Sequence, residues 1–199
     1  VALARRVLSG DLLLGPGLYY LSPLYIYFLA GLLALSDSLT FLRLVQIGLG
    51  TGAVGFVFLT ARGWFGPRAA WLAATLAALT GVFTFYEIVV FQSSIDVFLT
   101  AAGLWLFGRV LLRPVDDESF SLPIATGVVF GLALLNRPNI AIAIAGMVLA
   151  MLAARRWRTA ALLTAGLTLA VAPIAARNAI VTHSIAVTSS QGGLNFYVG

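Results

Sequence analysis

The chain is 199 residues long, 61% of its residues are hydrophobic, only 10% are charged, and its mean hydropathy is +1.02. A water-soluble domain needs more polar residues to cover its surface, so this composition excludes an ordinary soluble protein and indicates an integral membrane protein. The formal charge is +5 and the basic residues are all Arg. They are scattered between apolar runs, which is typical of topology signals and excludes a nucleic-acid partner. The sequence has no Cys and therefore no thiolate metal site.

The first part of the chain, residues 1–38, is predicted to form an extracytoplasmic loop with helices at the membrane interface. Its apolar run, 23–35, is short for a span and has Tyr near its start. Tyr rings favour the interface between lipid and water, so we expect a helix that lies at the outer surface of the membrane. A short, tilted span is the alternative.

The next part, residues 39–176, is predicted to be a transmembrane bundle. Crossing about 30 Å of hydrocarbon takes about 20 apolar residues, or fewer where flanking side chains reach the interface. Six runs fit this length, at 41–61, 68–86, 95–112, 122–136, 139–154 and 159–176. They are continuously apolar and lack the alternation of barrel strands. The prediction is an all-α polytopic membrane protein with about six transmembrane helices and an N-terminal helical segment at the outer interface, in a single membrane domain over 1–199.

Arg residues set the predicted orientation of these helices, because cytoplasmic loops carry an excess of basic residues. They lie in alternate loops, at Arg62 and Arg68, at Arg109 and Arg113, and at Arg155, Arg156 and Arg158. The segments around Asp96 and Arg137, and residues 177–199, then fall on the extracytoplasmic side together with the N-terminal stretch. Close helix packing is expected at the small residues Gly48, Gly50, Gly52 and Gly55.

Two carboxylates, Glu87 and Asp96, stand between long apolar runs. An acidic side chain at the bilayer centre costs roughly 2.5–3.5 kcal/mol, so acidic residues next to spans are candidates for function. Both are predicted catalytic residues. Asp96 is also the candidate ligand of a divalent cation, because hard cations that hold phosphate prefer carboxylate oxygens. The alternative is that Asp96 caps a helix that begins near Ile95.

Cationic residues are predicted at the same face. Arg137, followed by Pro138, could clamp a phosphate through two N–H groups, or could anchor the chain among lipid headgroups. Arg177 and Asn178 follow the last apolar run in the same way and could hold a phosphate or mark the interface. Arg137, Arg177 and Asn178 are the candidate substrate-binding residues.

Short motifs along the chain occur in an order that resembles a known class of enzymes. They are Ala4 to Asp11, Tyr19 to Leu24, Ser38 to Leu44, Gly66 to Ala70, Tyr86-Glu87 with Asp96, Asn136-Arg137-Pro138, Pro173 to Asn178, and the terminal stretch Ser189 to Gly199. This order is similar to that of the polytopic GT-C glycosyltransferases, in particular the relatives of protein mannosyltransferases and of lipid A aminoarabinose transferases. The pair Leu21-Ser22 stands where the aminoarabinose branch has Glu-Lys, which argues against that sugar.

The resemblance implies an enzyme that moves a sugar from a polyprenyl-phosphate donor to an acceptor on the extracytoplasmic face, with Mg or Mn as the candidate divalent cation. The acceptor is left open among protein, lipid and polysaccharide. The resemblance also places the family's first acidic pair upstream of Val1, so the chain is expected to be the N-terminal membrane part of a longer enzyme and inactive alone. The expected location is the bilayer of a bacterial inner membrane.

Two other classes fit the composition. A polytopic transporter could use Glu87 and Asp96 to bind a coupling ion, although a transporter is expected to carry ionisable residues at the membrane midplane and on broken helices. The third possibility is a membrane scaffold without a site.

Overall fold

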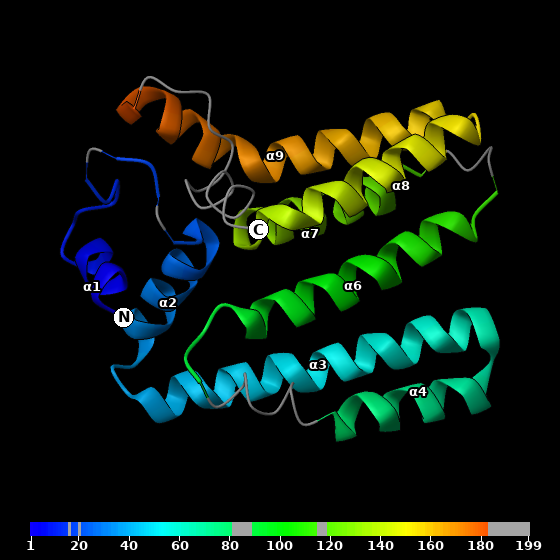
Figure 1. Ribbon diagram of the computed structural model, residues 1–199, viewed down its shortest axis with the longest axis horizontal. Coiled ribbons are helices and arrows are strands. Elements are labelled where there is room, and N and C mark those ends of the chain that lie inside the picture. The colour runs from blue at the N-terminus through cyan, green and yellow to red at the C-terminus, as the bar shows by residue number, and fades with distance from the viewer. Residues whose placement is uncertain (16, 20, 81–88, 115–118, 183–199) are drawn as a thin grey trace.

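We describe the fold from a computed structural model, in which all residues are considered except 16, 20, 81–88, 115–118 and 183–199. Over the described residues every regular element is helical (Figure 1), which confirms the all-α class. In chain order these elements are α1 (Ala2–Leu8), α2 (Pro23–Leu35), α3 (Leu39–Phe65), α4 (Pro67–Leu79), α6 (Ser93–Leu111), α7 (Ser121–Asn136), the short 3₁₀ helix η1 (Pro138–Ile140), α8 (Ala141–Ala153) and α9 (Trp157–Thr182).

The helices begin and end at residues that suit these positions. The side chains of Ser22 and Ser38 precede α2 and α3, and each accepts a hydrogen bond from the backbone N–H three residues on. Such caps satisfy N–H groups that the first turn of a helix leaves without a partner. Helix α3 ends at Gly66, whose φ of +87° suits glycine, and Pro67 then opens α4.

The helices follow the predicted apolar runs, but not all of them are long enough to count as membrane spans by length alone. Among the described residues α3, α6 and α9 are long and apolar enough to cross a membrane. Three other apolar stretches are shorter, namely α2, α7 and Pro138–Ala153. Helix α4 ends at Leu79, and most of the remainder of the predicted run 68–86 lies outside the described residues.

Neighbouring helices of the described chain pack in succession, with α4 against α3, α3 against α6, α6 against α7, α7 against α9 and α9 against α8. Helices α1 and α2 pack against each other at one end of these helices, where α2 also contacts α3 and α7. The first turn of α6 and the last turns of α7 and α9 lie at that same end. The α3–α4 turn, the end of α6 and the α8–α9 turn lie at the opposite end (Figure 1).

The Arg-bearing loops therefore meet at one end of the bundle. In one of them, Arg156 folds over the last turn of α6 and donates to the carbonyl oxygens of Val110 at 3.2 Å, of Arg113 at 2.6 Å and of Pro114 at 3.1 Å. A cation at this position stabilises the helix end, because the last carbonyl groups carry partial negative charge. The contact fixes the α8–α9 turn against α6.

The closest helix packing is between α7 and α9. A Cβ atom built on Gly127 would overlap the carbonyl oxygen of Leu163, and one on Gly131 would lie 2.7 Å from the Cβ of Ala170. Gly166 of α9 meets α7 in the same way, at the carbonyl of Ile124. The backbones of the two helices are thus in direct contact, as small residues at a spacing of four allow in membranes.

The close packing predicted at Gly48 and Gly55 of α3 is wrong. A Cβ at Gly48 or Gly55 would meet nothing within 4 Å, and one at Gly52 would meet the ring of Phe98 at 2.9 Å, which is a side chain and not a backbone. Gly48 and Gly55 therefore face no neighbour, and Gly52 makes room for a side chain of α6. Helix α3 has more glycines than α7, but the backbone of a neighbouring helix lies against Gly127 and Gly131 of α7 and not against Gly48, Gly52 or Gly55.

Candidate functional site

Asp96 lies in the first turn of α6 and faces α7. Helix α6 begins at Ser93 with Gln92 as its N-cap and has no side-chain cap, so the interpretation of Asp96 as a helix cap is wrong. The side chain of Asp96 is only 13% exposed. A carboxylate that is this far removed from water needs N–H partners to offset its desolvation.

Arg137 supplies one of these partners. It follows the last residue of α7, and its Nε lies 3.0 Å from Oδ2 of Asp96. Its Nη2 lies 3.5 Å from the hydroxyl of Ser93. The side chain of Arg137 is 47% exposed, and its Nη1 has no partner among the described residues. The guanidinium therefore pairs with Asp96 on one side and can still donate to an anion on the other.

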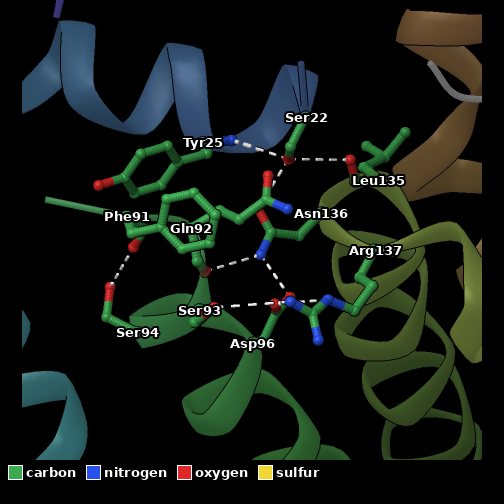
Figure 2. Close-up of polar contacts among 10 residues, drawn as sticks. All are labelled: Ser22, Tyr25, Phe91, Gln92, Ser93, Ser94, Asp96, Leu135, Asn136 and Arg137. Atoms are coloured by element: carbon green, nitrogen blue, oxygen red, sulfur yellow. Dashed lines mark hydrogen bonds and ion pairs between the residues drawn. The ribbon is translucent and has the colours of Figure 1, made fainter. Parts of the chain in front are cut away.

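Asn136 supplies the second partner, and sequence analysis missed it as a site residue. Figure 2 shows its amide between the start of α2 and the start of α6. Its Nδ2 donates to Oδ1 of Asp96 at 2.5 Å and to the carbonyl of Gln92 at 3.1 Å, and its Oδ1 accepts from the hydroxyl of Ser22 at 2.7 Å. The sequence offers two signals, an amide at the end of an apolar run and its place in the motif Asn136-Arg137-Pro138, but neither assigned it a role in the site.

A second buried amide lies beside this cluster. Gln46, in α3, is 1% exposed, and its Nε2 donates to the hydroxyl of Ser94 at 2.8 Å and to the carbonyl of Phe91 at 3.3 Å. The hydroxyl of Tyr25 is within 3.4 Å of the same nitrogen. Polar contacts thus tie α2, α3, α6 and α7 together at one end of the bundle.

A groove of about 520 Å³ opens beside the ion pair. Its lining residues come from α3, from α6 and from the turn between α7 and α8, and they are Val57, Asp96, Val97, Thr100, Ala101, Leu104, Arg137, Asn139 and Ile140. From Asp96 to Leu104 the groove follows α6 for about 12 Å, at 1.5 Å per residue. It is polar at the end of the bundle where the ion pair lies and becomes apolar along the helix.

Arg177 lies at the same end of the bundle but in a separate cluster. It is 6% exposed, and its guanidinium donates to the carbonyl oxygens of Leu13, of Gly15 at 2.9 Å and of Gly17 at 2.7 Å. Its Nη1 also donates to Oδ1 of Asn178 at 3.0 Å, and Asn178 is fully buried. Every N–H of Arg177 is used by the protein itself, so this residue fixes the loop after α1 to the end of α9.

Tyr19 completes this attachment. Its ring lies 4.2 Å from the Cζ of Arg177, and its hydroxyl is 2.6 Å from that of Tyr27, which in turn donates to the carbonyl of Leu12 at 2.7 Å. Burial raises the pKa of Tyr19 above its usual value, so the phenol stays neutral next to the guanidinium. The loop is held from α2 as well as from α9.

Replacing Arg177 with Met is expected to release this loop. The change removes the hydrogen bonds that the carbonyl oxygens of Leu13, Gly15 and Gly17 accept from the guanidinium, and a hydrogen bond to a charged group contributes about 1.5–3 kcal/mol. We expect faster cleavage by chymotrypsin at the loop and a lower Tm in detergent. Arg5→Met is the matched control, because Arg5 forms only an exposed ion pair with Asp37. Equal cleavage rates in the two variants would contradict the assignment.

The other predicted site residues have different outcomes. Glu87 lies outside the described residues. Of the carboxylates that are described, Asp11 pairs with Arg6 and Asp37 with Arg5, so neither joins Asp96. The described part of the chain holds no group of three His, Cys, Asp or Glu side chains that could bind a metal ion. Asp96 is the one described carboxylate of this cluster, and a bound cation stays a prediction.

Comparison with known protein families decides between the alternatives. The sequence profile of the dolichyl-phosphate-mannose-protein mannosyltransferases matches residues 21–178, a range that includes Asp96, Arg137 and Arg177. This chain belongs to that family. Comparisons with curated proteins and with solved structures give no significant match.

Family membership confirms the predicted resemblance and the enzyme class. The protein is a glycosyltransferase that uses a sugar linked to a polyprenyl phosphate. Membership of this family, together with the long apolar helices α3, α6 and α9, indicates a multi-pass integral membrane protein. The transporter and scaffold alternatives are thereby set aside.

Proposed function

We propose that the protein transfers a sugar from a polyprenyl-phosphate donor to an acceptor at the extracytoplasmic face of a bacterial inner membrane, and that Asp96 and Arg137 belong to the site. The observation that carries this proposal is the ion pair at the polar end of an otherwise apolar groove. A polyprenyl-phosphate sugar has the same distribution of polarity, because a charged phosphate joins a long hydrocarbon chain. The groove suits such a donor with its phosphate at Arg137.

The chemistry assigns different roles to the two residues. As the bond from the anomeric carbon to the phosphate oxygen breaks, negative charge grows on the departing lipid phosphate, and a fixed cation stabilises that charge. Arg137 can do this with the N–H groups that Asp96 does not use. Asp96 would orient the attacking hydroxyl of the acceptor or accept its proton. Glu87, on the segment before α6, is the second proposed carboxylate of the site.

The proposed orientation follows from the two ends of the bundle. The Arg-bearing turns at one end favour the cytoplasm, which leaves the end with α1, α2, Asp96 and Arg137 outside. In this arrangement α3, α4, α6, α7, α8 and α9 form six spans, and α2 lies at the outer interface. Arg177 and Asn178 then act on substrate only indirectly, by holding the loop after α1.

The test is sugar transfer by the full-length protein in lipid vesicles, with a series of radiolabelled polyprenyl-phosphate sugars and an extract of envelope acceptors. Arg137→Gln is expected to raise the KM for the donor about 10- to 100-fold, because a hydrogen bond to a charged group contributes about 1.5–3 kcal/mol. Arg109→Gln, at the other end of α6 and stacked on Trp105, is the control. It is expected to leave the KM unchanged.

Two results would contradict the proposal at different levels. A full-length protein that transfers no sugar from any polyprenyl-phosphate donor would overturn the proposed function. A working enzyme in which Arg137→Gln and Arg109→Gln have the same KM would retain the function and overturn the assignment of the phosphate site.

A further inference from the structure

Asn136 is among the most buried polar residues of the described chain, and all of its polar atoms are used. It is 1% exposed, and its amide contacts three segments, namely Ser22 before α2, Gln92 before α6, and Asp96 within α6. A buried amide is costly unless it is fully hydrogen-bonded, so its presence at the end of an apolar helix calls for a physical reason.

The contacts allow only one orientation of this amide. The carboxylate of Asp96 and the carbonyl of Gln92 can only accept hydrogen bonds, so both must face the NH₂ group of Asn136. The hydroxyl of Ser22 then donates to the amide oxygen. Turning the amide over would place its oxygen against two other acceptors. Ser22 and Gln92 thus fix the amide, and the amide fixes one oxygen of Asp96.

The consequence concerns the second oxygen of Asp96. With Oδ1 held by Asn136, Oδ2 is directed toward Nε of Arg137 and toward the groove that both residues line. We propose that Asn136 is a positioning residue, whose amide holds the carboxylate of Asp96 in the orientation that the transfer reaction uses. This inference rests on the proposed function, in which Asp96 meets the acceptor.

Ser22 extends the arrangement to α2. Its hydroxyl lies 2.7 Å from Oδ1 of Asn136 and 3.2 Å from the carbonyl of Leu135, and its oxygen also accepts from the N–H of Tyr25 at the start of α2. The position of α2 is therefore linked to the carboxylate of Asp96 through two side chains. Ser22 is a second positioning residue with a weaker expected effect, because it touches Asn136 and not Asp96.

The test is a double-mutant cycle on kcat with the full-length protein in vesicles and the donor found active with the wild type. Asn136→Ala is expected to lower kcat roughly 10- to 100-fold, because a small misplacement of a reacting group has effects of this size, while the KM for the donor changes less than about threefold. In an Asp96→Asn background the same change is expected to lower kcat by less than about threefold. A residue that acts through Asp96 has little effect once Asp96 is lost.

Thr126→Val is the matched control. Thr126 is also fully buried in α7, but its hydroxyl bonds only to the carbonyl of Leu122 in its own helix. It is expected to change kcat by less than about twofold. If Asn136→Ala does not fold, Ser22→Ala repeats the cycle, with an expected loss of about threefold that disappears in the Asp96→Asn background.

The outcomes separate this inference from the proposed function. A wild-type enzyme that is active, with losses of the same factor in both backgrounds, would overturn the positioning role alone. So would an Asn136→Ala enzyme as active as Thr126→Val. A wild type without any transfer activity would overturn the proposed function and this inference with it.

Discussion

Asp96→Asn is expected to lower the kcat of sugar transfer by about 10²- to 10⁴-fold, the range that a positioned acid or base contributes. The asparagine has nearly the same shape, and its oxygen can still accept the hydrogen bond that Asn136 donates. It carries no charge, so it cannot accept a proton from the acceptor, and it loses the ion pair with Arg137. The measurement is steady-state transfer by the purified full-length protein, together with its Tm in detergent.

Asp37→Asn is the control for this substitution. Asp37 lies between α2 and α3 and is paired with Arg5, but its side chain is 75% exposed. Exposed ion pairs contribute about 0–1 kcal/mol, so the control is expected to leave both kcat and Tm close to those of the wild type. If Asp96→Asn retained the activity of Asp37→Asn, Asp96 would be a structural residue that only joins α6 to α7.

Loss of Arg137 is expected to have a different kinetic signature from loss of Asp96. Arg137 is proposed to contact the phosphate both in the bound donor and as charge grows on it, so its loss is expected to raise the KM for the donor and also to lower kcat. Asp96 is proposed to act on the acceptor hydroxyl during bond formation, so its loss is expected to lower kcat and to leave the KM for the donor nearly unchanged. The two substitutions together therefore test whether the ion pair is a site with two roles or a single structural contact.

Sequence reasoning predicted the helices well because they follow apolar runs, which are local features. The apolar runs located the helices, whereas the caps at Ser22 and Ser38 and the break at Gly66-Pro67, which set their ends, were not predicted. The alternation of Arg-bearing loops along the chain also predicted that Asp96 and Arg137 lie at the same end of the bundle. Antiparallel neighbours that alternate in direction place the start of one helix beside the end of the next, which is what α6 and α7 do.

The neutral polar residues of the site could not be predicted in this way. Asn136 and Gln46 carry no charge, and one amide in an apolar run gives no sign of which helix it will face. Their partners, Ser22 and Ser94, are distant in the sequence and are brought near only by the packing of α2 against α7 and of α3 against α6. Contacts of this kind depend on helix rotation, which composition does not determine.

Arg177 shows a second limit of prediction from sequence. An Arg at the end of a buried helix can hold an external phosphate or the carbonyl oxygens of its own chain, and the two cases have the same sequence. In this protein the second case applies, because carbonyl groups of the loop around Gly15 and Gly17 accept hydrogen bonds from the guanidinium. The prediction of a substrate contact at Arg177 therefore becomes a proposal about loop position.

The largest expected effect on folding comes from Gly127→Leu. At this position the backbone of α9 is so close that a Cβ would overlap the carbonyl oxygen of Leu163 and lie 2.8 Å from the amide nitrogen of Leu167. Backbone atoms of a helix cannot move aside as a side chain can. Added volume in a packed interior costs about 1–3 kcal/mol even where side chains adapt, so we expect a larger loss here and separation of α7 from α9.

The measurement is the fraction of protein that remains monodisperse after extraction into mild detergent, with Tm as the second readout. Gly48→Leu and Gly55→Leu are the controls, because a Cβ at either position in α3 meets nothing within 4 Å. Gly127→Ala is expected to lie between Gly127→Leu and these controls, since a single methyl already overlaps the carbonyl of Leu163. A Gly127→Leu protein as stable as Gly48→Leu would mean that α7 and α9 are farther apart than described.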